Sequence, residues 1–142
     1  AFVEDEIMSD GTGDMNLLFP EWKDKGVDRI CLFGAGDYGK RMLNELQLRG
    51  FLVHSYIDND EKKWNTRICG IPCYGMDYLV KHQEHTAVIV SALAEDEIKL
   101  QLKKNNIKYI KKYSEIYKKL FYCEPLKSVL KENLKHEHEV EA

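Results

Sequence analysis

The chain has 142 residues and a net charge of −3, with 44% hydrophobic and 32% charged residues. This length favours one domain with its own core, and it leaves little room for the second, substrate-holding region of a conventional dehydrogenase. The balanced charge gives no sign of a nucleic-acid partner, and no apolar run approaches the roughly 20 residues of a membrane span. Because no signal segment opens the chain and its cysteines are scattered, a cytoplasmic location is expected.

The apolar pattern divides the chain into three regions. Residues 1–15 are rich in acids and glycine without an apolar period, and they predict a flexible acidic leader. Residues 16–122 alternate between apolar runs and helical patterns, which predicts a single nucleotide-binding domain. Residues 123–142 begin with helical apolar spacing and then lose it, which predicts a C-terminal helix with a loose tail. That helix could dock on this domain, on a twin or on a larger parent enzyme.

Within the central region, strand and helix patterns follow one another. A short apolar cluster around Pro20 predicts a short helix before the first strand. The run from 67 to 74 is interpreted as an extended excursion, since Pro72 does not suit a central strand. The predicted strands cover 27–33, 51–57, 85–90 and 107–110, and the predicted helices cover 38–49, 77–81, 95–105 and a segment from 114. This order predicts an α/β fold, a Rossmann-like three-layer sandwich with a mostly parallel sheet of about five strands and helices on both faces.

A glycine-rich turn joins the first strand to its helix and consists of Gly34, Ala35, Gly36, Asp37, Tyr38 and Gly39. In such a turn the first glycine permits a tight bend, the second lets phosphate oxygens reach the backbone, and the third lets helix and strand pack closely. Free N–H groups at the helix start then favour an anion. Asp37 complicates this prediction, because its carboxylate either caps the same N–H groups or repels a phosphate.

Polar residues at the ends of two further strands complete the candidate binding site. Asp58 ends the second strand pattern, where a carboxylate accepts hydrogen bonds from ribose hydroxyls and repels a 2′-phosphate, so NAD is favoured over NADP. Asp58 and Asn59 also fit a simple strand-ending turn. Ser91 and Ala92 follow the strand over 85–90, where they either approach the ligand or begin the next helix.

No catalytic group accompanies the predicted site. No Tyr is followed four residues later by Lys, and the sequence contains neither a phosphate-binding Gly-Lys loop nor a nucleophile turn. Cys69 and Cys73 have three residues between them, whereas common zinc and redox pairs have two. The sequence therefore predicts no catalytic or metal site and leaves open whether the chain is part of an enzyme.

Three segments of the chain, CLFGAGDYGKRMLNEL, SYIDNDEKK and CGIPCYGMDYL, resemble the Rossmann-like domains of bacterial surface-polysaccharide biosynthesis. Similar modules form the N-terminal part of nucleotide-sugar dehydratases and sugar acyltransferases. The resemblance matches the glycine turn to their phosphate site, and Asp58 with Asn59 to their ribose site. It implies a module that holds NAD or a UDP-sugar in a glycan pathway, with the catalytic region of such an enzyme outside this chain.

Two other hypotheses stay open. The first is a non-catalytic interaction or oligomerisation domain of a larger glycosyltransferase or methyltransferase, in which the crevice has lost its ligand. In that case the C-terminal helix joins the domain to a twin or to its parent enzyme. The second is a methyltransferase, which usually carries an acid just before the glycine turn, where this chain has Leu32 and Phe33.

Overall fold

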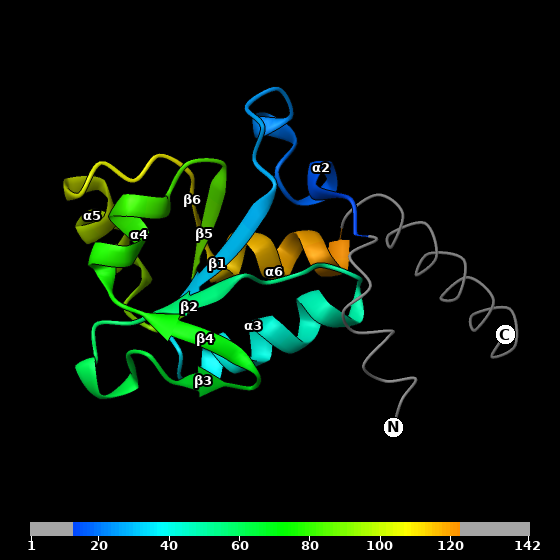
Figure 1. The fold of residues 1–142 in the computed structure, drawn as a ribbon. Helices are drawn as coiled ribbons and strands as arrows, with labels where there is room; N and C mark the ends of the chain where they lie inside the picture. The colour runs from blue at the N-terminus through cyan, green and yellow to red at the C-terminus, as the bar shows by residue number, and fades with distance from the viewer. Residues whose placement is uncertain (1–12, 123–142) are drawn as a thin grey trace, which may run out of the picture.

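A six-stranded sheet forms the centre of the computed structural model, which describes residues 13–122 (Figure 1). The strands lie in the order β3-β4-β2-β1-β5-β6, and all neighbouring pairs are parallel except β3 with β4. Their bounds are β1 (Arg29–Phe33), β2 (Ser55–Ile57), β3 (Arg67–Ile68), β4 (Ile71–Tyr74), β5 (Thr86–Val90) and β6 (Ile110–Lys112). The predicted α/β fold with a mostly parallel sheet is thus confirmed.

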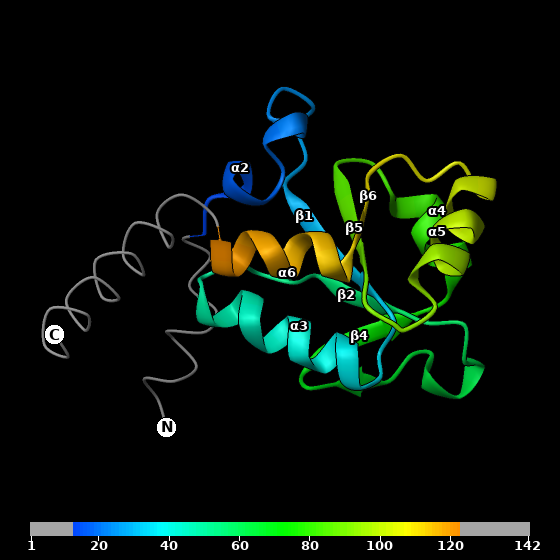
Figure 2. The same ribbon diagram turned by 180° about the vertical axis from the view of Figure 1, so that it is seen from behind.

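Helices cover both faces of this sheet (Figure 2). One face packs against α3 (Asp37–Leu48) and α6 (Tyr113–Tyr122), and the other packs against α4 (Met76–His82) and α5 (Glu95–Lys104). The other helices of residues 13–122 are α2 (Met15–Leu18) and the short 3-10 turns η1 (Pro20–Trp22) and η2 (Glu61–Lys63). Among the described residues no helix is long and apolar enough to cross a membrane.

After its first residue, each of the central strands β1, β2 and β5 is apolar, as expected for strands covered on both faces. Successive side chains of a strand point to opposite faces, so β1 and β5 contribute to two cores at once. Leu32 and Ile89 pack on the side of α3 and α6, whereas Cys31 and Val88 pack on the side of α4 and α5. Every residue of β5 is buried. The unbroken apolar runs in the sequence therefore reflect a sheet that is enclosed on both sides.

Helix α3 has the amphipathic pattern expected from the sequence. Its apolar positions Met42, Leu43 and Leu46 are buried against the sheet, and its other face is polar. The helix ends at Leu48, and Gly50 follows with φ 83°, the left-handed conformation that glycine adopts most easily. The observed helix agrees with the predicted range of 38–49 to within one residue at each end.

The segment predicted as an extended excursion is a β-hairpin. β3 and β4 pair with each other, and β4 also pairs with β2 through Tyr56 and Cys73. The tight turn between them places Cys69 at φ 54° and Gly70 at φ 80°. The hairpin adds a sixth strand to the five expected, and β3 takes the edge of the sheet.

The N-terminal segment is tied to α6 and its preceding strand. Lys119 Nζ donates a hydrogen bond to the carbonyl oxygen of Leu18 at 2.7 Å, and Lys111 Nζ donates to Glu21 Oε2 at 2.9 Å. Residues 1–12 of the predicted leader, and the whole predicted C-terminal helix and tail over 123–142, lie outside the described residues. The proposed division of the chain at 16–122 therefore stays a prediction.

Candidate functional site

A cavity of about 380 Å³ opens at the carboxyl ends of β1, β2 and β5. β1 lies between β2 and β5, because the chain adds β2, β4 and β3 on one side of β1 and then crosses to add β5 and β6 on the other side. Such a reversal of strand order creates a crevice at the sheet edge, which is where ligands of open α/β sheets bind. The cavity is lined by Gly34, Gly36, Asp37, Tyr38, Asp58, Lys63, Ser91, Ala92 and Leu93.

The three glycines of the turn occupy three different environments. A Cβ atom at Gly34, which has φ 111°, would lie 2.6 Å from the carbonyl oxygen of Ser91. A Cβ at Gly39 would lie 1.9 Å from the carbonyl oxygen of Gly34, so only glycine permits this approach of α3 to the turn. A Cβ at Gly36 would meet nothing within 4 Å, and Gly36 lines the cavity. The first and third glycines are thus required by packing, whereas the second faces open space.

The start of α3 presents backbone donors to the cavity. Gly36 is the residue that precedes the helix, and no side chain caps the helix start. Among residues 13–122, no acceptor is found for the N–H groups of residues 37–39. Asp37 lines the cavity without capping the helix, so its carboxylate adds negative charge beside these donors. The helix start favours an anion, and Asp37 opposes it.

Asp58 closes the glycine turn from the neighbouring strand. Its Oδ2 accepts a hydrogen bond from the N–H of Ala35 at 2.9 Å, and its Oδ1 accepts one from the N–H of Asp60 at 2.8 Å. Both oxygens have lone pairs left, since an ionised carboxylate offers about four acceptor positions. The side chain is 16% exposed and lines the cavity. Asp58 therefore holds the turn in shape and also presents a partly exposed carboxylate to the crevice.

Lys63 is a lining residue that the sequence reasoning missed. Its Nζ lies 3.7 Å from Asp58 Oδ2, and its side chain is 36% exposed. The turn η2 carries Lys63 to this position, and Trp64 fixes the turn by donating from Nε1 to the carbonyl oxygen of Asp58 at 2.7 Å. The only sequence signal was a pair of lysines after a predicted strand end. Lys63 therefore brings positive charge next to Asp58, in a lining that also contains Asp37.

The other predicted site residues divide between the cavity and its support. Ser91 and Ala92 line the cavity as expected, and Leu93 beside them is 83% exposed. Ala35 is buried and contributes only its backbone N–H to Asp58. Asn59 turns away toward α5, where its side-chain amide exchanges hydrogen bonds of 3.1 and 3.0 Å with that of Gln101. Asn59 is thus not among the residues that line the cavity.

The thiols buried in the sheet are held in their neutral form. Burial raises the pKa of Cys31 to about 11, and it raises the pKa of Cys73 to about 11 as well. The thiolate is the nucleophile and metal ligand, so these two side chains act as core residues. Within the described part of the chain, no group of three or more His, Cys, Asp or Glu residues is arranged to hold a metal ion.

Among solved structures, the fold is similar to the crystal structure of RSP, a Rex-family repressor. The identity is 17% and the TM-score is 0.47, with 69% of this chain and 52% of the repressor chain covered. The chain thus spans about half the length of that structure, and a likeness at this level carries no argument about function. A search of the curated proteins finds no match.

The resemblance to domains of surface-polysaccharide biosynthesis is wrong. Residues 26–120 match a different family model, described as C2185-like, N-terminal, and no comparison supports a function in a glycan pathway. The shared motifs follow from the fold: packing requires Gly34 and Gly39, and Asp58 is required to bond the turn. These residues report how the crevice is built and carry no information about a pathway. Since the match covers more than half of the sequence, the chain belongs to the C2185-like, N-terminal family.

Proposed function

We propose that the crevice at the carboxyl ends of β1, β2 and β5 binds a dinucleotide of the NAD type. The observation that carries this proposal is Gly36, whose missing side chain leaves the cavity open next to the free N–H groups of α3. A phosphate needs such a close approach to the backbone, and packing does not explain why this position is glycine. The cavity of about 380 Å³ lies within the range of small-molecule sites.

The charged residues around the cavity restrict where an anionic group of the ligand can bind. Asp37 and Asp58 are negative, and Lys63 supplies one positive charge among the lining residues, which offsets one of the two carboxylates. A diphosphate is therefore expected to bind where the N–H groups of α3 and the Lys63 ammonium both reach it.

The position of Asp58 favours NAD over NADP. Its carboxylate keeps acceptor positions for ribose hydroxyls after bonding Ala35 and Asp60. A 2′-phosphate at the same position would meet a negative charge and lose binding free energy. The exposed Leu93 at the rim offers an apolar contact to a base.

Isothermal titration calorimetry with NAD tests the proposal. The variant Lys63→Gln is expected to bind about tenfold more weakly, since one charge-assisted contact to a phosphate is lost. Lys62→Gln is the matched control, because Lys62 lies in the same turn but does not line the cavity. Gly36→Val should abolish binding while the far-UV circular dichroism spectrum stays unchanged. Absence of binding heat from the folded wild-type chain, or binding of a UDP-sugar in place of NAD, would reject the NAD assignment.

A second variant tests the electrostatic part of the proposal. Asp37→Asn removes the negative charge at the helix start and keeps the size of the side chain. We expect this variant to bind NAD several-fold more tightly than the wild type, with the difference shrinking at high salt. Weaker binding by Asp37→Asn would mean that the carboxylate contacts the ligand directly, which contradicts the proposed position of the diphosphate.

A further inference from the structure

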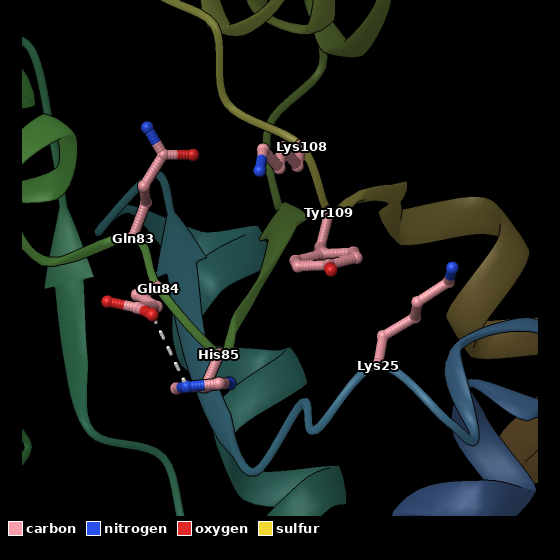
Figure 3. A pocket seen from close by; sticks show the side chains of 6 residues that line it. All are labelled: Lys25, Gln83, Glu84, His85, Lys108 and Tyr109. Atoms are coloured by element: carbon pink, nitrogen blue, oxygen red, sulfur yellow. Dashed lines mark ion pairs between the residues drawn. The ribbon is translucent and has the colours of Figure 1, made fainter.

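A second hollow, of about 350 Å³, lies at the amino ends of the strands, the opposite end of the sheet from the crevice (Figure 3). Its walls come from three connections that lead into the adjacent strands β1, β5 and β6. The lining residues are Lys25, Gln83, Glu84, His85, Lys108 and Tyr109. Since the amino ends of parallel strands lie at the same end of the sheet, residues more than 80 positions apart in the sequence line this hollow together.

The loops that form this hollow are held by backbone hydrogen bonds. The carbonyl oxygen of His85 accepts from the N–H groups of Asp28 at 2.9 Å and Arg29 at 3.2 Å. His85 adopts φ 62°, a conformation that an ordinary residue keeps only when its surroundings fix it. The ring of Tyr109 packs edge-on against Trp22 at a centroid distance of 5.1 Å. The walls are thus set before any ligand arrives, which lowers the entropic cost of binding.

The hollow carries net positive charge, since two lysines and one carboxylate line it. Among residues 13–122, neither Lys25 nor Lys108 has an ion pair or hydrogen bond to its ammonium group. By contrast, Lys111 is paired with Glu21 at 2.9 Å and Lys112 with Asp96 at 3.2 Å. The one lining carboxylate, Glu84, is directed to His85 Nε2 at 3.6 Å. Figure 3 places the Tyr109 ring between the two lysine side chains in the view.

We infer that this hollow binds a small phosphorylated molecule, at a site separate from the crevice. An ammonium group is a compact charge with three donors, which suits the tetrahedral oxygens of a phosphate. A phosphate monoester carries between 1.5 and 2 negative charges at neutral pH, and in this hollow it would meet two ammonium groups against the single carboxylate of Glu84. The amide of Gln83 and the ring of Tyr109 are partly buried and offer contacts to the organic part.

Nuclear magnetic resonance titration tests this inference with two probes, inorganic phosphate and phenyl phosphate, at constant ionic strength. We expect saturable shifts of the amide signals of Gln83, His85 and Tyr109, with phenyl phosphate binding more tightly because its ring contacts Tyr109. The double variant Lys25→Gln/Lys108→Gln should weaken binding at least tenfold. The control Lys103→Gln/Lys104→Gln removes the same charge from exposed positions of α5 outside the hollow, and it should bind as the wild type does.

Two outcomes would overturn the inference. Shifts that grow linearly without saturation, or that weaken equally in both double variants, would show general screening of surface charge. A short DNA duplex that shifts the same amides at a lower concentration than phenyl phosphate would assign the face to a nucleic acid. Neither outcome bears on the crevice, because shifts at Gly36 and Tyr38 report that site separately.

Discussion

The close approach of Gly39 to Gly34 is the tightest backbone requirement of the turn. A methyl group at position 39 would overlap the carbonyl oxygen of Gly34 and would also lie 3.1 Å from the ring of Tyr56. Neither neighbour moves easily, since one is backbone and the other is fully buried. Glycine is therefore required for folding at position 39, whereas at position 36 we attribute it to ligand binding.

Alanine substitutions at the two positions should change the free energy of unfolding by different amounts. Gly39→Ala should lower the free energy of unfolding by about 1–3 kcal/mol, the usual cost of overpacking. Gly36→Ala should change it by less than about 1 kcal/mol, because φ there is −94° and the space is open. Urea denaturation followed by circular dichroism gives both values. Equal losses in the two variants would contradict the assigned environments.

At the scale of elements, a ladder of stacked rings joins α4 to β4 and to the residue before β2, His54. Tyr74 stacks on Tyr78 at 3.8 Å, Tyr78 stacks on His82 at 4.2 Å, and His54 lies parallel to Tyr78 at 6.3 Å. Burial lowers the pKa of His54 below its ordinary value, and the positive charges of Arg29 and His82 act in the same direction. The ladder therefore favours the neutral form of His54.

This lowered pKa gives the stability a predictable pH dependence. Below the ordinary histidine pKa of about 6.5 the unfolded chain takes up a proton at His54 more readily than the folded protein does. The contribution of neutral His54 to the free energy of unfolding is thus complete above that pH. It is lost as the pH falls from about 6.5 through the lower pKa of the folded state. His54→Gln should make the loss of stability between about pH 7 and pH 5 shallower, as urea midpoints at each pH would measure. An unchanged slope would contradict it.

Most elements could be predicted from the sequence, because their signals are local. The strand over 85–90 is a continuous apolar run, and α3 has apolar spacing with a terminal glycine. The β3–β4 hairpin was missed because β3 has two residues and its turn places a cysteine, Cys69, in the left-handed region. Neither feature has a recognisable sequence pattern.

From the sequence, the lining of the cavity could be predicted only for residues that directly follow a strand. Asp58, Ser91 and four residues of the glycine turn follow strand ends and line the cavity, whereas Ala35 and Gly39 of the turn do not, and binding at this cavity stays a prediction. Lys63 was missed because its position depends on the hydrogen bond from Trp64 across the turn, which no pattern encodes. Asn59 was assigned to the site although it pairs with Gln101, 42 residues away.

At the scale of the whole molecule, one sheet supplies both cores. β1 and β5 send alternate side chains into the two clusters, so neither cluster exists without the same strands. Two tryptophans sample separate regions of this structure: Trp22 contacts Phe19 and Tyr109, and Trp64 contacts the end of β2. The domain is expected to unfold as a single cooperative unit.

Single-tryptophan variants test this cooperativity. Trp22→Phe leaves only Trp64, and Trp64→Phe leaves only Trp22. Within each variant, the urea midpoint from tryptophan fluorescence should coincide with the midpoint from far-UV circular dichroism. A fluorescence transition that precedes the dichroism transition in one variant would reveal a region that unfolds separately.

The open environment of Gly36 has a consequence for the evolution of this family. We expect selection for folding alone to retain Gly34 and Gly39 among homologues, because a Cβ atom at either position collides with backbone. The same selection leaves position 36 free to drift to alanine, serine or larger residues. Under the proposed function, we expect glycine at position 36 in homologues whose crevice is under selection for a ligand, and other residues there in homologues that keep only the scaffold.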